Sequence, residues 1–203
     1  MTAVNAVHPI EAESYRILEA RVDLRRFAPA ASAVVARVIH ASADLEYAQT
    51  MVVDDDAVAA GIEAVRAGAP VICDVEMVRH GITGIDARCY LSEVDAPAIA
   101  AGDTRAAAAM RLAAENHREG TIFVVGCAPT ALVEVVRLAT EGALSPALVI
   151  GLPVGFVGAA ESKQALRDSG LPAISNIGEK GGSAVAAAAL NALVRMAVAD
   201  GDA

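Results

Sequence analysis

The chain has 203 residues, of which 55% are hydrophobic and only 3% aromatic, and its formal net charge is −9. This length is enough for one hydrophobic core, so we expect a single domain over residues 1–203 that needs no disulfide or metal ion. The negative charge and the lack of long basic clusters argue against nucleic acid as a partner, because phosphate neutralisation requires grouped lysines and arginines.

Cysteine usage and the N-terminal sequence indicate where the protein works. Cys73, Cys89 and Cys127 are far apart and form no CxxC pair, so the sequence predicts neither a disulfide framework nor a metal site. The first residues lack the basic and apolar segments of a signal peptide. The uncharged stretch 142–160 is interrupted by prolines and glycines, which favours a strand and a loop over a membrane span. We therefore expect a cytoplasmic protein with no membrane partner.

Helical and strand patterns alternate along the sequence. Apolar residues at helical spacing predict helices over 30–43 and 54–67, and a strand follows at 70–74. The later predicted elements are a weak strand at 89–91, a helix at 103–117, a strand at 121–127, a helix at 129–139, a strand at 147–151, a helix at 158–168, a strand at 173–175 and a helix at 183–198. This order predicts an α/β fold, a single-domain, doubly wound, mainly parallel sheet with helices on both faces. Ligands of such folds bind beyond the carboxyl ends of the strands.

Two glycine-rich loops follow predicted strands at this edge. Residues 151–158 read GLPVGFVG and residues 178–183 read GEKGGS, and a helix is predicted after each. Neither has the spacing of a dinucleotide fingerprint or a P-loop. Glycines permit close approach of a ligand, and helix N-termini favour anions, although the same residues also suit tight turns and helix caps. The candidate ligand contacts here are Gly155, Lys163, Gly181 and Ser183, with Lys180 as a further cation.

Four further residues are chemical candidates. His40 lies near a predicted helix end, and Asp44 is close enough to orient its ring if the helix continues. Taken alone, such a histidine is more often structural than catalytic. Arg105 begins a predicted helix, which indicates either an anion contact or a solvent-exposed side chain. Cys127 is either a packed small residue or a nucleophile paired with a histidine. Asp74, after a strand, is expected to cap the following segment rather than to bind a cation.

Seven segments, in the family's order, resemble the precorrin-8X methylmutases. They are HPIEAESY (8–15), RVIHASAD (37–44), GAPVICDVEMVRHGIT (68–83), DTRAA (103–107), GCAPTALVEV (126–135), GLPVGFVGAAESK (151–163) and GEKGGSAVAAAALNAL (178–193). The resemblance extends from about residue 8 to residue 197 and covers nearly the whole chain. The cysteine of GCAPTA departs from the small or polar residues of the family, which counts against a catalytic Cys127.

The resemblance implies an isomerase of cobalamin (vitamin B12) biosynthesis. Such an enzyme moves a methyl group from C-11 to C-12 of precorrin-8X to give hydrogenobyrinic acid, or acts on cobalt-precorrin-8 to give cobyrinic acid. It uses no separate cofactor, binds a corrinoid tetrapyrrole as substrate and product, and forms a homodimer with the site near the interface. By the family's motifs, His40 is catalytic and protonates the ring, whereas Ser14, Thr83 and Arg105 contact the substrate.

The residues alone leave two other functions open. A non-catalytic corrinoid carrier would bind the same kind of ring and would not need His40. A thiol hydrolase would instead depend on Cys127 and a histidine, and alkylating reagents would inactivate it. The methyl migration itself needs a positioned ring and one proton, so a single histidine is sufficient for it.

Overall fold

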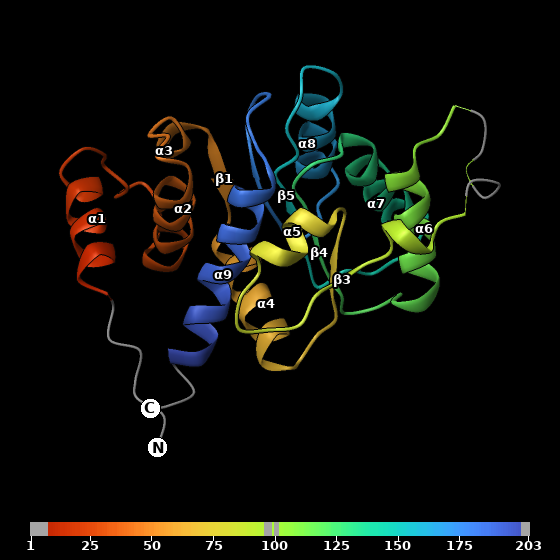
Figure 1. Cartoon of the computed structure of the whole chain (residues 1–203), viewed down its shortest axis with the longest axis horizontal. Helices are drawn as coiled ribbons and strands as arrows, with labels where there is room; N and C mark the ends of the chain where they lie inside the picture. Colours follow the sequence, from red (N-terminus) through yellow and green to blue (C-terminus); the bar gives the residue numbers. More distant parts are fainter. Residues whose placement is uncertain (1–7, 96–98, 100–101, 200–203) are drawn as a thin grey trace.

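The computed structural model describes residues 8–95, 99 and 102–199. One six-stranded sheet lies between two layers of helices (Figure 1). The strand order is β1-β6-β5-β4-β2-β3, and neighbouring strands are parallel except for the antiparallel pair β1 and β6. The predicted α/β fold with a mainly parallel sheet and helices on both faces is confirmed.

The strands are short, and the central ones are fully buried. In chain order they are β1 (Met51–Val53), β2 (Val71–Cys73), β3 (Arg88–Cys89), β4 (Ile122–Val125), β5 (Leu148–Gly151) and β6 (Ala173–Asn176). Every residue of β4 and β5 is buried, as expected of parallel strands that are covered on both faces. The weak strand prediction at 89–91 is displaced, because β3 ends at Cys89 and a 3₁₀ turn, η1 (Leu91–Glu93), follows.

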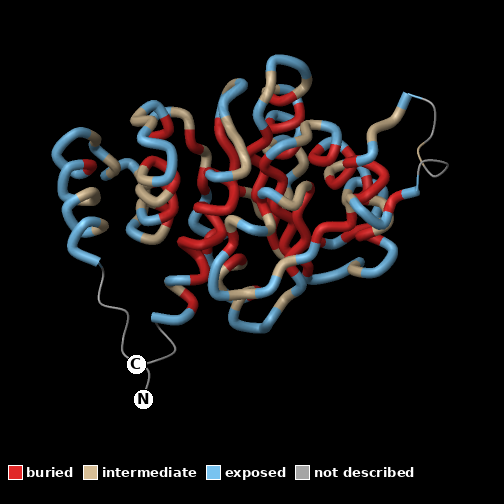
Figure 2. Tube along the Cα trace, viewed as in Figure 1, coloured by how far each residue is buried: buried red, intermediate tan, exposed pale blue. Residues whose placement is uncertain are grey.

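The helices form two layers, each with its own hydrophobic core. One layer contains α1 (Pro9–Glu19), α2 (Pro29–Ser42), α3 (Tyr47–Thr50), α4 (Asp55–Arg66), α5 (Glu76–Gly81) and α9 (Ser183–Ala199). The other contains α6 (Arg105–Asn116), α7 (Pro129–Thr140) and α8 (Ala159–Asp168). Alternate residues of β4 enter the two cores, since Val124 belongs to the first and Phe123 to the second. Figure 2 shows the buried residues concentrated in the sheet and on the helix faces against it.

The end of α2 reaches the carboxyl edge of the sheet because β1 runs against the other strands. Met51, the first residue of β1, pairs with Asn176, the last residue of β6. The chain passes from α2 through the short α3 directly into β1. The C-terminal turn of α2 therefore lies at the same edge as the glycine-rich loops after β5 and β6. The outermost helix, α1, packs against α2 (Figure 1).

Candidate functional site

His40 lies in the last turn of α2 and is half-buried against α1. Its Nδ1 is 2.8 Å from Ser14 Oγ. The ring of Tyr15 stacks on the imidazole, with 5.1 Å between the ring centroids and an interplanar angle of 14°. Within the described part of the chain, His40 Nε2 has no hydrogen-bond partner. The ring is thus fixed at one nitrogen and on one face, while the second nitrogen has no such partner.

Glu11 fixes α1 beside α2 and α9. Its Oε1 accepts hydrogen bonds from Arg37 of α2 at 2.8 Å and from Arg195 of α9 at 2.5 Å. The hydrogen bond from Arg195 lowers the pKa of Glu11 and outweighs the opposing effect of burial. Glu11 and Tyr15 belong to the motif HPIEAESY but were not predicted as site residues. The motif contains them, but it does not show which neighbouring helix each side chain contacts.

The contact between Asp44 and His40, which the sequence allowed only if the helix continued, is not formed. Helix α2 ends at Ser42, and Ala43 has a left-handed backbone with φ of 53°. The helical spacing on which the contact depended therefore stops before Asp44. Asp44 instead accepts a hydrogen bond from Lys180 Nζ at 2.6 Å, which lowers the pKa of the carboxyl. Lys180 also binds Glu46, at 2.8 Å, and so joins the loop after β6 to the end of α2.

The two glycine-rich loops form one unit. The N–H of Gly182 donates to the carbonyl of Leu152 at 2.9 Å, and the N–H of Gly155 donates to the carbonyl of Glu179 at 3.1 Å. A Cβ atom at Gly181 would lie 2.3 Å from the carbonyl oxygens of Leu152 and of the next residue. Glycine is required at position 181 because the two backbones approach each other there, whether or not a ligand is bound.

Lys163 lies behind these loops and not on their accessible side. Its side chain is fully buried, and Nζ donates to Asn176 Oδ1 at 3.0 Å and to the Lys180 carbonyl at 2.7 Å. Burial, reinforced by the positive charge of Arg167, lowers the pKa of Lys163 to about 8. The predicted contact between Lys163 and a substrate does not fit this placement, since an ammonium bound inside the protein is not accessible to a ligand.

The remaining predicted site residues lie on separate elements. Thr83 is exposed after α5, and its N–H donates to Asn191 Oδ1 of α9 at 2.9 Å. Arg105 is the exposed first residue of α6, and its Nη1 donates to the Val94 carbonyl at 3.1 Å. Ser183 is the first residue of α9, directly after the second glycine-rich loop. Among the predicted residues, the structure brings Ser14 and His40 into direct contact.

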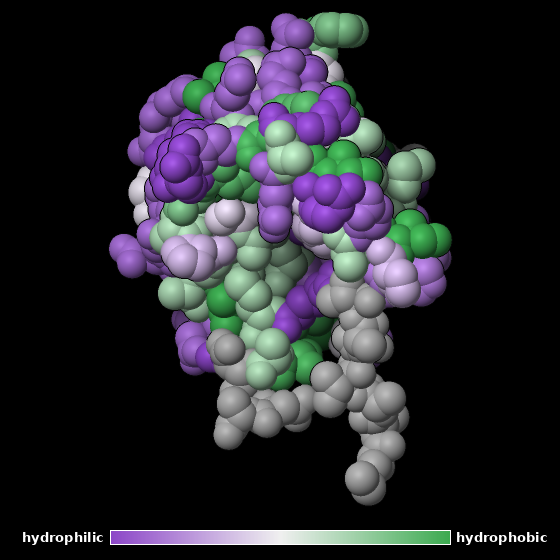
Figure 3. Space-filling model, turned by 90° about the vertical axis from the view of Figure 1, so that its left-hand side faces the viewer, coloured by the Kyte–Doolittle hydropathy of each residue, from purple (hydrophilic) through white to green (hydrophobic). Residues whose placement is uncertain are grey.

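An open groove of about 740 Å³ lies between α1 and the first half of α2, and neither Ser14 nor His40 lines it. Tyr15 and Leu18 of α1, the segment 19–27 and the start of α2 line it, so the tyrosine that stacks on His40 also forms part of the groove wall. Figure 3 shows the end of the molecule where α1 lies. Apolar side chains gather in the hollowed middle of this face, and hydrophilic ones surround them.

Comparison with known proteins identifies the family. The family model for precorrin-8X methylmutase matches residues 9–196. The chain belongs to the precorrin-8X methylmutase family. It is 44% identical to the cobalt-precorrin-8 methylmutase of Priestia megaterium over 91% of this chain and 85% of the relative. It is 42% identical to the precorrin-8X methylmutase of Sinorhizobium sp, with 90% and 91% covered. The crystal structure of the precorrin-8X methylmutase of Thermus thermophilus superposes with a TM-score of 0.87 at 40% identity, covering 95% of this chain and 97% of that one.

Membership of the precorrin-8X methylmutase family makes the chain an isomerase of cobalamin biosynthesis. The resemblance seen in the sequence is confirmed, and the fold agrees with that of the solved methylmutase. No helix in the described ranges is long and apolar enough to cross a membrane. Within those ranges there is also no group of three or more histidine, cysteine, aspartate or glutamate side chains that could hold a metal ion.

Asp74 binds the loop between β4 and α7 of the methylmutase fold. Its buried carboxylate accepts hydrogen bonds from the N–H groups of Gly126, Cys127 and Ala128, at 3.0, 2.8 and 2.7 Å. These amides precede α7, whereas the sequence favoured a cap of the segment after β2. The carboxylate thus fixes the end of β4 relative to β2. Partial burial and the nearby Asp74 charge raise the pKa of the Cys127 thiol, which counts against a thiolate nucleophile.

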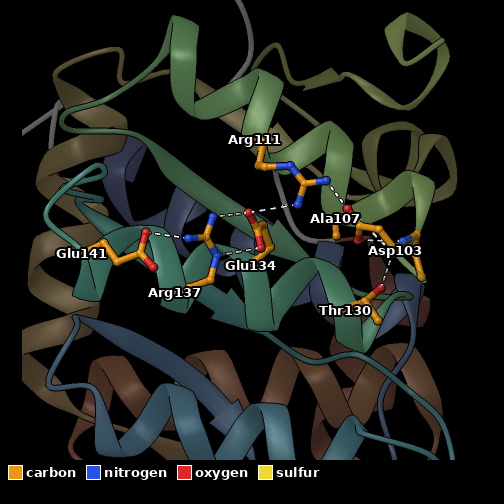
Figure 4. A network of polar contacts seen from close by, with 8 residues as sticks. Asp103, Ala107, Arg111, Thr130, Glu134, Arg137 and Glu141 are labelled. Carbon is orange, nitrogen blue, oxygen red and sulfur yellow. Dashed lines mark hydrogen bonds and ion pairs between the residues drawn. The ribbon is translucent and has the colours of Figure 1, made fainter. Parts of the chain in front are cut away.

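A network of charges holds α6 against α7 (Figure 4). Glu134 of α7 is buried, and its carboxylate is bound by Arg137 at 2.7 Å and by Arg111 of α6 at 3.2 Å. Arg111 also binds Asp103, which precedes α6, and Arg137 binds Glu141 at 2.5 Å. The network fixes the helix whose first residue is the predicted substrate contact Arg105.

Thr104 joins the N-termini of the same two helices. Its Oγ1 accepts a hydrogen bond from the N–H of Ala107, so Thr104 caps the N-terminus of α6. The same oxygen lies 2.7 Å from Oγ1 of Thr130, in the first turn of α7 (Figure 4). The position of Arg105 is therefore determined by both helices.

Proposed function

We propose that the protein moves a methyl group from C-11 to C-12 of precorrin-8X to give hydrogenobyrinic acid, or of cobalt-precorrin-8 to give cobyrinic acid. The observation that carries this proposal is the Ser14–His40 pair. The ring of His40, which belongs to the family's histidine motif, is fixed at Nδ1 by Ser14 and stacked on Tyr15. Such a ring suits the delivery of one proton from Nε2.

The role of His40 is to protonate a nitrogen of ring C of the substrate. The Ser14 hydroxyl oxygen accepts a hydrogen bond from Nδ1–H in the imidazolium, and also in the neutral ring that remains once Nε2 has lost its proton. The contact at Nδ1 is therefore kept throughout the transfer. Protonation makes the adjacent framework electron-poor and lowers the barrier to migration. Because the migration is intramolecular, it needs a positioned ring and no second reactant.

The carboxyl edge supplies contacts for both parts of a corrinoid. The carboxylates of a corrinoid require cations and hydrogen-bond donors, for which we propose the side chains of Ser14, Thr83, Arg105, Lys180 and Ser183. At Gly155 and Gly181 we propose that the ligand closely approaches the backbone. The macrocycle of a corrinoid is largely apolar. The side chains of Phe156 and Val157, on the first glycine-rich loop, are 91% and 88% exposed. Large apolar side chains with this exposure are typical of surfaces that a ligand or a partner covers.

The wider assignment follows the same resemblance. We propose a cytoplasmic homodimer with the site near the subunit interface, no separate cofactor, and neither nucleic acid nor a membrane as partner. In this arrangement the second subunit adjoins the bound ring. Sedimentation at several protein concentrations measures the oligomeric state, and a monomer at all of them would contradict the dimer.

The deciding experiment is incubation of the protein with metal-free and with cobalt-bearing substrate, followed by the absorbance change of the conjugated ring. We expect the wild type to convert at least one of the two. His40→Ala should lose about 10²- to 10⁴-fold in turnover, the usual contribution of a positioned acid, and should still bind the substrate. His80→Ala, on the exposed surface of α5, is the matched control. Binding without conversion by the wild type would instead identify a carrier.

A further inference from the structure

The two lysines of the chain are directly connected. Lys163 and Lys180 are the only lysines in the sequence. Lys163 is fully buried on α8, whereas the side chain of Lys180 is 46% exposed on the loop after β6. The ammonium of Lys163 donates to the backbone carbonyl of Lys180 at 2.7 Å. Asn176, the last residue of β6, accepts from the same ammonium at Oδ1 and donates from Nδ2 to the same carbonyl, at 3.0 and 2.9 Å.

This arrangement resists movement of the loop. A buried ammonium requires oxygen partners, because it has lost the water that would solvate it. No carboxylate of the described residues forms an ion pair with Lys163, so the Asn176 amide and the Lys180 carbonyl take that role. If the loop moved away, a buried cation would lose one of its two partners. The loop is therefore held from inside by a charge.

The effect of this contact extends to His40. The loop after β6 is hydrogen-bonded to the first glycine-rich loop through Gly182 and Leu152. On its outer side, the Lys180 side chain binds Asp44, four residues after His40. The position of the Lys180 backbone thus affects both glycine-rich loops and the end of α2. Lys163 is the buried residue on which these contacts depend.

We propose that Lys163 is a positioning residue of the ligand site, which fixes the loop of residues 177–182 so that Lys180, Gly181 and Gly182 are in place before the ligand arrives. The residue acts through the loop and does not touch the ligand. The inference rests on the proposed function for the identity of the ligand. The geometry of the loop can be tested separately.

The first test separates substrate binding from chemistry. Lys163→Met keeps most of the length of the side chain and removes its N–H donors. We expect KM to rise about tenfold, corresponding to one lost charge-assisted hydrogen bond, with kcat within about twofold of the wild type. His40→Ala should instead lower kcat and leave KM nearly unchanged. A folded Lys163→Met variant with unchanged KM would overturn the proposal, and so would a loss confined to kcat.

The second test needs no turnover. An amine-acylating reagent, followed by peptide mass spectrometry, reports the two lysines individually. In the wild type we expect Lys163 to react at least about a hundredfold more slowly than Lys180, because acylation requires the loop to open. Asn176→Ala removes one partner of the ammonium and should accelerate acylation of Lys163 about tenfold. Lys180→Met keeps the backbone carbonyl and should leave Lys163 protected.

The two tests fail in different ways. If Lys163 reacts as fast as Lys180 in the wild type, the loop is not held and the inference is wrong, whatever the protein catalyses. If the labelling results hold but no methyl migration occurs, the proposed function fails and the positioning of the loop stands. Should Lys163→Met not fold, Asn176→Ala replaces it in the kinetic test, with the same expected rise in KM and the same outcome overturning the inference.

Discussion

His40 keeps two neighbours whose contacts do not depend on its charge. Tyr15 covers one face of the ring, and the Ser14 hydroxyl can either donate to Nδ1 or accept from it. A carboxylate in place of Ser14 would favour the charged ring and hold the proton more tightly. The hydroxyl instead fixes the orientation of the ring through a contact that is available to both charge states of the imidazole.

Replacement of Ser14 by alanine should therefore affect the chemistry more than the fold. We expect Ser14→Ala to lower kcat about fivefold to tenfold, the equivalent of roughly 1 kcal/mol for one lost hydrogen bond. Stopped-flow absorbance with saturating substrate measures the effect, and circular dichroism verifies the fold. Ser92→Ala, on the exposed η1 turn, should behave as wild type. An unchanged kcat in Ser14→Ala would show that Tyr15 alone is sufficient to orient the ring.

At the scale of elements, the pairing of α6 with α7 depends on one buried carboxylate. Burial raises the pKa of Glu134, but hydrogen bonds from Arg137 and Arg111 outweigh this effect and bring the pKa below its usual value of 4.5. A carboxyl group whose pKa is lower in the folded than in the unfolded chain stabilises the fold at any pH above its pKa in the unfolded chain. That contribution is lost as the pH falls to the pKa of the group in the folded chain.

Removal of this charge should destabilise the protein in a pH-dependent way. We expect Glu134→Gln to lower the free energy of unfolding by about 1–2 kcal/mol at pH 7, because the hydrogen bonds to two partly exposed arginines lose their charge assistance. The difference from wild type should shrink below pH 4.5, where Glu134 of the unfolded chain takes up a proton, and should disappear below the lowered pKa of the folded protein. Urea unfolding at pH 7 and pH 3.5 measures it. The control is Glu141→Gln, a half-exposed partner of the same Arg137, which should cost less than about 1 kcal/mol.

The contact between the glycine-rich loops leads to a second prediction at this scale. Gly181→Ala would place Cβ against two backbone carbonyls, so the loops must separate. We expect a loss of about 2–3 kcal/mol in unfolding free energy, as for other overpacked sites, and weaker ligand binding. Gly178→Ala, in the same loop, meets no atom within 4 Å but has a φ of +88°, and strain alone should cost about 1 kcal/mol. Equal losses in the two variants would contradict the steric explanation.

At the scale of the whole molecule, both hydrophobic cores depend on the same sheet. Because alternate residues of β4 enter opposite cores, neither core can be lost without exposing the other. We predict one cooperative unfolding transition, as for a single domain over residues 1–203. Tyr47 lies in the first core and Tyr90 in the second. In each of the Tyr47→Phe and Tyr90→Phe variants, tyrosine fluorescence and far-ultraviolet circular dichroism should give coincident urea curves, and two separated midpoints within one variant would indicate two folding units.

Much of the fold could be predicted from the sequence, because the central strands lie in uninterrupted apolar runs and most helices show regular spacing. The three-residue strand β1 was not predicted, whereas β2, which is equally short, lies within the predicted strand at 70–74. The end of α2 was also hidden. Helices often stop at a glycine, but here Ala43 takes the left-handed conformation, so the sequence did not show whether Asp44 contacts His40.

The site was predicted in its residues more than in its contacts. The histidine motif identified His40, whereas the contact with Ser14 joins positions 26 residues apart, and no local pattern shows it. Lys163 was placed at the ligand because it is a cation that closely follows the first glycine-rich loop. Its burial follows from the packing of α8 against β6, which the sequence of either element alone does not reveal.

The antiparallel pairing of β1 with β6 also has a consequence for how the chain is made. Met51, the first residue of the sheet in the chain, pairs with Asn176, the last residue of β6. This pair can therefore form only after most of the chain has been synthesised. The α2 helix, which carries His40, likewise packs against α9, the last helix of the chain. Contacts between such distant positions form late, because a long loop must first close. During translation, the surroundings of His40 are therefore completed only after nearly the whole protein has been synthesised.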